Sequence, residues 1–307
     1  MGPAHVSEIR ALISKAKRWD LFFSLIGMMA LLLAVLVLVG LFVNLLIDGA
    51  PRLSWEFFTN FSSRRATSAG IAAAWIGTLL VMLVTAMTAV PLGVSAGVYL
   101  EEYAPKNWLS SIIEINISNL AGVPSIVYGL LGLGLFVYLL DLGHSIAAAG
   151  LTLALLILPI VIVATREAIR TIPKVIREGA YALGATKWQM VSHHILPYSS
   201  AGILTGIIIG LARAIGETAP LITVGAAVAI FTHPSSPVKS EFPYLSFEWL
   251  KEDFTVMPIQ MFQWTSRPDP AFQVNAAAAG LVLIAMTLLM NGFAIYLRYR
   301  LRKNIKW

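Results

Sequence analysis

Long apolar runs separated by short polar segments dominate the chain. Six runs are long enough to cross a bilayer as helices, and they cover residues 21–47, 71–98, 112–140, 145–165, 199–231 and 272–297. A membrane-crossing helix needs about 20 predominantly apolar residues. The pattern therefore predicts an all-α integral membrane protein with six transmembrane helices.

Glycine and proline interrupt two of these runs. Gly122 and Pro124 fall within the third run, and Gly216 and Pro220 fall within the fifth, which is too long for one straight crossing. A proline inside a spanning helix frees a backbone carbonyl that neighbours or water must satisfy. We therefore expect both helices to be broken, either as packing kinks or as parts of a site.

The composition agrees with a membrane protein. Of the 307 residues, 58% are hydrophobic and 12% are charged, and a soluble protein of this size would expose too much apolar surface. The net charge is +6, but the cations lie beside apolar runs and form no stripe, so we expect no nucleic-acid partner. The chain has no cysteine, which excludes disulfides and thiolate metal sites, and we expect no metal ion or cofactor.

The basic residues predict the orientation of the helices. Residues 21–47 form a retained span, because this run is far longer than the apolar region of a signal peptide. With the N-terminus inside, 15 of the 22 lysines and arginines are cytoplasmic and six are external, in agreement with the positive-inside rule. We therefore expect both termini in the cytoplasm, with residues 1–20 and 298–307 as the cytoplasmic ends.

Two long connections fall within the predicted transmembrane domain, residues 71–297. Residues 166–197 are expected in the cytoplasm and residues 232–271 outside. The external connection is rich in proline and aromatic residues, which fits either a plain connector or a docking surface for an extracytoplasmic partner.

Residues 178–197 form a polar, helix-forming island between two apolar runs. Gly184 favours the left-handed conformation that ends a helix, and Thr186 with Gln189 forms the pattern of a capping box that begins another. The apolar side chains of the island are Tyr181, Leu183, Trp188, Met190 and Val191. Two interpretations remain open on these grounds: a partner covers this apolar surface, or the island lies on lipid headgroups, which Lys187 and Trp188 would also suit.

The island follows a spaced pattern. Residues in register with E-A-A, three residues, Gly, nine residues and I-x-L-P are Glu178, Ala180, Gly184, Leu196 and Pro197. Gly179 replaces the middle alanine, and His194 occupies the isoleucine position. The segment resembles the EAA loop of ABC-importer permeases, which implies that it docks on ATPase subunits. On this resemblance the coupling residues are Glu178, Gly179, Ala180, Gly184, Thr186, Lys187 and Trp188.

Two charged residues, Arg213 and Glu217, lie within an otherwise apolar run. Each charge near mid-bilayer costs about 2.5–3.5 kcal/mol, so neither is expected to face lipid. Their spacing places them on one helix face, together with Gly202, Gly206 and Gly210, which would let another helix approach closely. The physics leaves two roles open: a buried ion pair that holds the bundle, or an arginine that meets an anion on a translocation path.

Most of the chain resembles the A-type permease subunits of phosphate importers. The segments that carry this resemblance are residues 91–105, 119–133, 212–221 and 254–273. It implies the type I ABC-importer permease fold with a cytoplasmic coupling-helix loop. It also implies a C-type second permease (PstC), two ATPase subunits (PstB) and an external phosphate-binding protein (PstS).

The same resemblance assigns roles to Arg213 and Glu217. Arg213 would neutralise phosphate in transit, and Glu217 would hold Arg213 in place or exchange with it. Asn119 and Tyr128 would line the path, or would instead bond to neighbouring helices. The pair Glu101 and Glu102 is expected to be solvated or to face a partner.

Several functions are disfavoured by what the sequence lacks. It has no G-x-x-x-x-G-K-[ST] loop for ATP, and no H-E-x-x-H or G-x-S-x-G motif of a protease or lipase. We therefore expect a non-catalytic subunit whose partners hydrolyse ATP. The alternatives are a permease for sulfate or molybdate, and a gradient-driven secondary transporter, which would need no ATPase dock.

Overall fold

The computed structural model describes residues 3–302, except residues 227–229, 233, 238–243 and 245. Its α-helices are α1 (Pro3–Gly49), α2 (Trp55–Thr59), α3 (Ala72–Val98), α4 (Trp108–Leu120), α5 (Ser125–Gly132), α6 (Ile146–Arg170), α7 (Lys174–Ala182), α8 (Lys187–Met190), α9 (Leu196–Ile215), α10 (Ala219–Val224), α11 (Met257–Thr265) and α12 (Ala271–Arg302). The π-helical segments are η2 (Tyr99–Tyr103), η3 (Leu133–Leu139) and η4 (Val191–Ile195), and the 3₁₀ segments are η1 (Ala50–Arg52) and η5 (Glu248–Lys251).

The described residues form no strand, and the expected all-α membrane fold is confirmed. Five helical segments are long and apolar enough to cross a membrane, and they cover Ala16–Arg52, Ala72–Tyr103, Ile146–Arg170, Lys187–Ile215 and Ala271–Arg300. A sixth span results if the bent pair formed by α4 and the helix after it is counted as one. The first and last helices extend further toward the chain ends than the sequence predicted, to Pro3 and Arg302.

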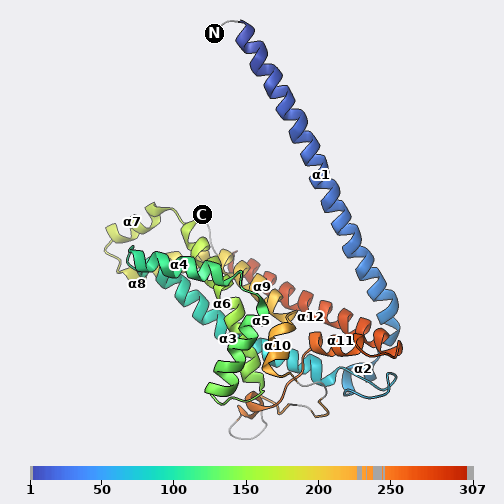
Figure 1. The fold of residues 1–307 in the computed structure, drawn as a ribbon. Helices are drawn as coiled ribbons and strands as arrows, with labels where there is room; N and C mark the ends of the chain where they lie inside the picture. The colour runs from blue at the N-terminus through green and yellow to red at the C-terminus, as the bar shows by residue number, and fades with distance from the viewer. Residues whose placement is uncertain (1–2, 227–229, 233, 238–243, 245, 303–307) are drawn as a thin grey trace.

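The expected break in the third span is confirmed and is larger than a kink. Trp108–Leu120 and Ser125–Leu139 meet at 106°, so α4 and α5 point in clearly different directions (Figure 1). Pro124 is extended at φ −55° and ψ 136° and precedes α5, as expected for a residue that cannot continue a helix. The Tyr128 hydroxyl donates to the Leu120 carbonyl at 2.8 Å and connects the two arms.

The expected interruption of the fifth run, residues 199–231, is confirmed, and the part after it begins with a short separate helix, α10, instead of a continued span. The helix α9 ends at Ile215 with Gly216 as its C-cap. Pro220 does not kink a continuous helix, because it lies in the first turn of α10, where its missing N–H costs no hydrogen bond. Gly225 then adopts φ +97° and ends α10.

The core lies among α3, α6 and α9. Gly93 and Gly97 of α3 face Val161 and Thr165 of α6, and an added Cβ at either glycine would lie 2.7 Å from those side chains. Close approach of helix backbones at small residues stabilises packing in membranes, where the hydrophobic effect between helices is weak.

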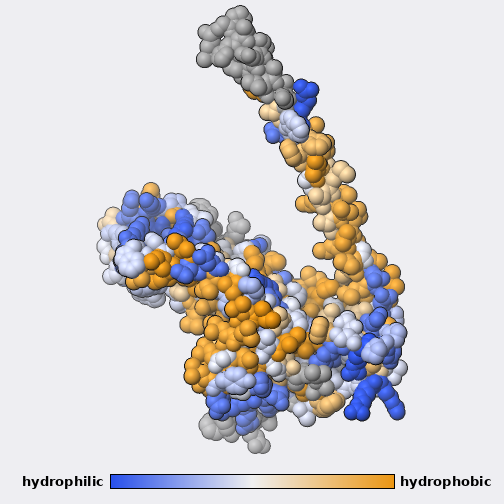
Figure 2. All heavy atoms as spheres, in the orientation of Figure 1, coloured by the Kyte–Doolittle hydropathy of each residue, from blue (hydrophilic) through white to orange (hydrophobic). Residues whose placement is uncertain are grey.

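The first helix stands apart from this core. In Figure 1, α1 leaves the bundle beside α12 and projects away from it, and Figure 2 shows a continuous apolar surface along it. No residue in its most apolar stretch is buried. The N-terminal end of α1 and the C-terminal end of α12 lie on the same side of the molecule as α7 and α8 (Figure 1). The helices α2 and α11 and the segment η5 lie on the other side.

Three aromatic residues anchor the connection at residues 232–271, which the sequence predicts to be external. Trp249, Phe254 and Trp264 are buried in the core, whereas Phe247 and Phe262 are exposed. The aromatic residue Phe242 of this connection and the basic residues Lys239, Lys303 and Lys306 lie outside the described residues.

Candidate coupling segment and polar path

The candidate coupling segment, residues 178–197, has the local structure that its sequence predicts. Gly184 adopts φ +82° after α7, and Thr186 caps α8 through a complete capping box with Gln189. The Gln189 backbone N–H donates to Thr186 Oγ1 at 3.3 Å, and the Thr186 backbone N–H donates to Gln189 Oε1 at 2.8 Å. The helix–turn–helix form of this segment is therefore confirmed.

The apolar side chains of the segment divide into two groups. Met190 and Val191 are buried in a cluster with Ile169 of α6, so they do not belong to the exposed apolar surface that the sequence predicted. They pack inward because α8 continues through η4 into α9 and carries its apolar face onto the end of α6. Leu183 and Trp188 remain 91% and 66% exposed.

The other predicted coupling residues occupy different environments. Glu178 and Gly179 are exposed on α7, whereas Ala180 is buried. Lys187 is exposed, and its Nζ lies 4.9 Å from the centre of the Tyr103 ring, within the range of a cation–π contact. Of the predicted coupling residues, Ala180 is therefore buried and the others are exposed.

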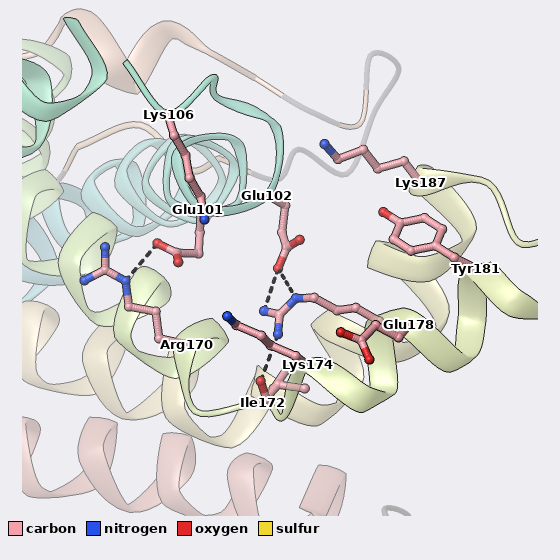
Figure 3. A pocket seen from close by; sticks show the side chains of 10 residues that line it. Glu101, Glu102, Lys106, Arg170, Ile172, Lys174, Glu178, Tyr181 and Lys187 are labelled. Carbon is pink, nitrogen blue, oxygen red and sulfur yellow. Dashed lines mark hydrogen bonds and ion pairs between the residues drawn. The ribbon is translucent and has the colours of Figure 1, made fainter. Parts of the chain in front are cut away.

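A hollow of about 500 Å³ separates α7 from the end of α3. Figure 3 shows Glu102 on one wall and Lys174, Glu178 and Tyr181 on the facing wall. Within the described residues, Lys174 and Glu178 form no ion pair. The hollow thus has charged groups available to a partner beside the coupling segment.

One ion pair fixes α7 to η2, the segment that continues α3. Arg177 donates to Glu102 Oε1 from Nε at 3.0 Å and from Nη2 at 2.7 Å, and the Glu102 side chain is 7% exposed. Arg177 also donates to the carbonyls of Ile172 and Ile169 at 2.8 and 3.1 Å. A guanidinium that bridges a carboxylate and two helix-end carbonyls holds the base of α7 rigidly.

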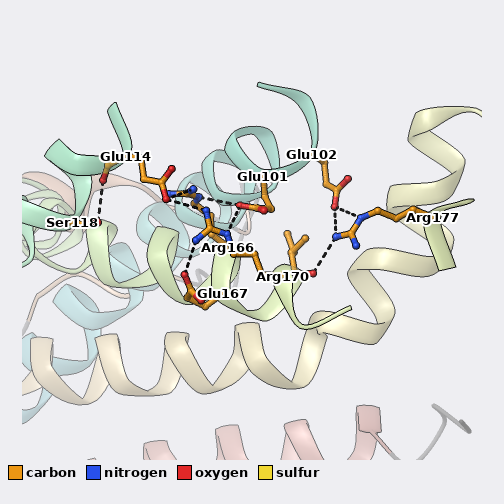
Figure 4. A network of polar contacts seen from close by, with 9 residues as sticks. Glu101, Glu102, Glu114, Ser118, Arg166, Glu167, Arg170 and Arg177 are labelled. Carbon is orange, nitrogen blue, oxygen red and sulfur yellow. Dashed lines mark hydrogen bonds and ion pairs between the residues drawn. The ribbon is translucent and has the colours of Figure 1, made fainter. Parts of the chain in front are cut away.

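A second ion-pair cluster joins the end of α6 to α4 (Figure 4). Arg166 Nη2 lies 2.6 Å from Glu114 Oε1 and Arg166 Nε lies 3.4 Å from Glu101 Oε2. Arg170 contacts the same two carboxylates at 2.9 and 3.0 Å. Arg166 is 5% exposed, so its charge requires these partners.

The expectation for Glu101 and Glu102 is therefore wrong, since both carboxylates pair with arginines of the same chain. Two features of the sequence indicate that these ion pairs could form. Glu101 and Glu102 are adjacent carboxylates after a span, and Arg166 and Arg170 lie four positions apart. Their spacing shows that the two arginines share one helix face, but it does not reveal which carboxylates they meet.

Arg213 and Glu217 contact each other. Arg213 Nε lies 3.2 Å from Glu217 Oε1, and the two side chains are 39% and 16% exposed. Glu217 follows the C-cap of α9 and precedes α10, so the pair spans the break between these helices. Asn119 is exposed at the end of α4 and is not in hydrogen-bond contact with Arg213 in the described structure.

The glycine stripe of α9 faces α6. An added Cβ at Gly202 would lie 2.6 Å from the Ala168 side chain, and one at Gly206 would overlap that of Ala164. At Gly210 the nearest side-chain atoms lie at 3.6 Å, an ordinary contact. The stripe therefore serves close packing, while Arg213 lies at its edge and remains open to a ligand or a partner.

Comparison with known proteins gives one family. The model of the binding-protein-dependent transport system inner membrane component family matches residues 89–303. A phosphate transport system permease protein PstA from Yersinia pestis is 34% identical over 274 residues, which cover 86% of this chain and 84% of that protein. A probable PstA from Methanocaldococcus jannaschii is 29% identical over the full length of both chains.

Two further matches extend the comparison. A probable ABC transporter permease, YqgI, from Bacillus subtilis is 37% identical over 198 residues, covering 64% of this chain and 67% of that protein. A chain of the MetNI methionine ABC transporter, solved in inward-facing conformations, has a TM-score of 0.56 at 16% identity and covers 73% of this chain and 93% of its own. The helical arrangement is therefore that of an ABC-importer permease. The chain belongs to the family of inner membrane components of binding-protein-dependent transport systems.

Proposed function

We propose that this chain is the permease subunit of an ATP-driven importer of inorganic phosphate. The observation that carries the proposal is its similarity to proteins named PstA along 86% of its length, combined with a half-exposed arginine in an apolar span. A phosphate transporter needs a cation on its path, because the bilayer core excludes an anion unless its charge is compensated.

Arg213 is the proposed phosphate contact. Its ion pair with Glu217 leaves 39% of the side chain exposed, so guanidinium N–H donors remain available to an oxyanion. Phosphate in transit would compete with Glu217 for these donors, and the carboxylate would recover them after the anion leaves. Tyr128, which bonds to Leu120 across the break between α4 and α5, and Asn119 are proposed to line the same path.

The segment from α7 to α8 is the proposed contact with the ATPase. Leu183 and Trp188 are exposed, and an aqueous location does not favour two large exposed apolar side chains on one short segment. A partner that covers them would move α7, and Arg177 would transmit this movement to α3 through Glu102.

The proposal includes the assembly and its orientation. The chain would pair with a second permease of the PstC type, two PstB ATPases and an external PstS protein, with both of its termini in the cytoplasm. The apolar, unburied stretch of α1 supports a helical partner or lipid along that helix.

Reconstitution tests the proposal directly. The chain and its candidate partners are placed in liposomes, and ATP-driven entry of phosphate, sulfate and molybdate is compared. Entry of phosphate that requires both ATP and the external binding protein is the expected result. Preferential entry of sulfate or molybdate would support the alternative oxyanion permease, and phosphate entry that follows an ion gradient without ATP would contradict the proposal.

A further inference from the structure

Four arginines gather on the face of the molecule opposite the coupling segment. Arg52, Arg64, Arg65 and Arg267 form no ion pair with any carboxylate in the described structure. On the opposite face, by contrast, Arg166, Arg170 and Arg177 pair with glutamates. Figure 2 shows a strongly hydrophilic patch in the region of α2, and no carboxylate of the described residues forms an ion pair with these four arginines.

Three of these arginines line one hollow. The hollow has a volume of about 670 Å³ and is lined by Ser62, Ser63, Arg64, Arg65, Ser68, Phe231 and Arg267. None of these lining residues is acidic. Guanidinium groups beside hydroxyl groups are the combination that binds oxyanions well, because both donate hydrogen bonds and the guanidinium adds charge.

The loop that carries the lining residues from Ser62 to Ser68 is held by several side-chain hydrogen bonds. Arg52 donates to the carbonyls of Ala66, Thr67 and Ala69 at 3.4, 2.7 and 2.9 Å, and its Nε donates to Asn275 Oδ1 at 2.9 Å. Arg52 is thus a structural cation that ties the loop to α12. A site held in its binding geometry loses less entropy when it takes a ligand.

Arg267 forms the fixed wall of the hollow. It donates from Nη1 to the Ser63 carbonyl at 3.3 Å, and its Cζ lies 4.2 Å from the centre of the Phe272 ring. These two contacts orient the guanidinium while leaving other N–H donors free.

Arg64 and Arg65 have no comparable structural role. Both are exposed, and their side chains form no hydrogen bond or ion pair with other described residues. In the proposed orientation they also oppose the positive-inside rule, which disfavours cations outside. Neither packing nor topology therefore explains two adjacent arginines at this position.

We propose that this hollow is an external binding subsite for a tetrahedral oxyanion of the phosphate class. Its role as an entry point ahead of Arg213 rests on the proposed function. Arg64 and Arg65 would supply charge and donors, Arg267 the fixed donor, and the hydroxyls of Ser63 and Ser68, which lie 3.1 Å apart, the remaining hydrogen bonds.

Equilibrium binding of radiolabelled inorganic phosphate tests the subsite. The full chain, copurified with its partner subunits but without ATP or the external binding protein, is measured in the Arg213→Gln background, so that the path contributes no binding. We expect saturable binding whose Kd rises about tenfold or more in Arg64→Gln/Arg65→Gln, the scale of losing one or more charge-assisted hydrogen bonds. Lys251→Gln, which removes an exposed charge outside the hollow, is the matched control and is expected to leave the Kd unchanged.

Additional measurements distinguish free phosphate from a lipid headgroup as the ligand of the hollow. The Kd is measured in maltoside and in nanodiscs of phosphatidylglycerol, and equal values are expected for a site that takes free phosphate. Loss of binding in the nanodiscs would assign the hollow to a lipid headgroup and overturn its role as a substrate subsite. Arg64→Lys/Arg65→Lys, which keeps both charges, is expected to retain most of the binding.

The outcome is separable from that of the proposed function. If the double glutamine variant binds phosphate like its parent, or if it loses only affinity for the external binding protein, the subsite is refuted while ATP-driven phosphate uptake still stands. If uptake is specific for another oxyanion while the hollow binds phosphate, the function fails and the subsite remains.

Discussion

Arg177 and Glu102 are 75 positions apart in the chain, and two nitrogens of the arginine contact one oxygen of the glutamate at 3.0 and 2.7 Å. This pair is the direct polar connection between α7 and the helix that ends in η2. Because the Glu102 side chain is 7% exposed, its charge depends on Arg177. The base of the coupling segment and the end of α3 therefore move together.

Glu102→Gln is expected to weaken coupling between ATP hydrolysis and phosphate uptake. The substitution keeps the size of the side chain but removes its charge, which costs about 1.5–3 kcal/mol for a charged hydrogen bond. The ratio of phosphate transported to ATP hydrolysed in proteoliposomes should fall. The exchanged pair Glu102→Arg/Arg177→Glu should recover part of the ratio, and an unchanged ratio in Glu102→Gln would contradict the linkage.

Gly184→Ala is expected to destabilise the coupling turn, whereas Gly179→Ala is the matched control. Gly184 has φ +82°, and no atom lies within 4 Å of an added Cβ at either glycine. Steric hindrance therefore does not distinguish the two sites, but a left-handed alanine costs about 1–2 kcal/mol. In α7, alanine instead stabilises by about 0.5–1 kcal/mol relative to glycine. Copurification of the ATPase should decrease for Gly184→Ala alone, and equal copurification of both variants would rule out a role for the turn conformation.

Arg213→Gln is expected to reduce phosphate uptake by about 10- to 100-fold, the value of one charge-assisted hydrogen bond, while the subunits still assemble. The exposed guanidinium is not required for packing, since the glycines of α9 make the contacts with α6. Initial uptake rates and subunit stoichiometry are measured in the same preparation. Wild-type uptake in this variant would remove Arg213 from the path.

Gly206→Leu is expected to disrupt the packing of α9 on α6, whereas Gly292→Leu should be tolerated. A Cβ at Gly206 would overlap Ala164, while one at Gly292 meets nothing within 4 Å. Overpacking of this kind costs about 1–3 kcal/mol. The thermal unfolding midpoint of the purified chain should fall for Gly206→Leu only, and equal midpoints would show that the α6–α9 contact adapts readily.

The local features of the coupling segment followed from sequence because their causes lie within a few residues. The left-handed Gly184 and the capping box of Thr186 with Gln189 depend on backbone conformation and on contacts three positions apart. The break at Pro124 was predictable for the same reason. Its 106° angle was not, because the direction of α4 depends on Glu114 meeting the arginines of α6.

The sequence by itself determined the helical class, most of the spans, the break positions and the turn of the coupling segment, since these depend on apolar length and on local backbone chemistry. Only the tertiary structure decided which charges pair and which apolar residues are buried. Glu101 and Glu102 meet arginines more than 60 positions away, and Met190 turns inward where Leu183 does not. These outcomes depend on which helices pack together, and residue spacing along one helix carries no information about its distant neighbours.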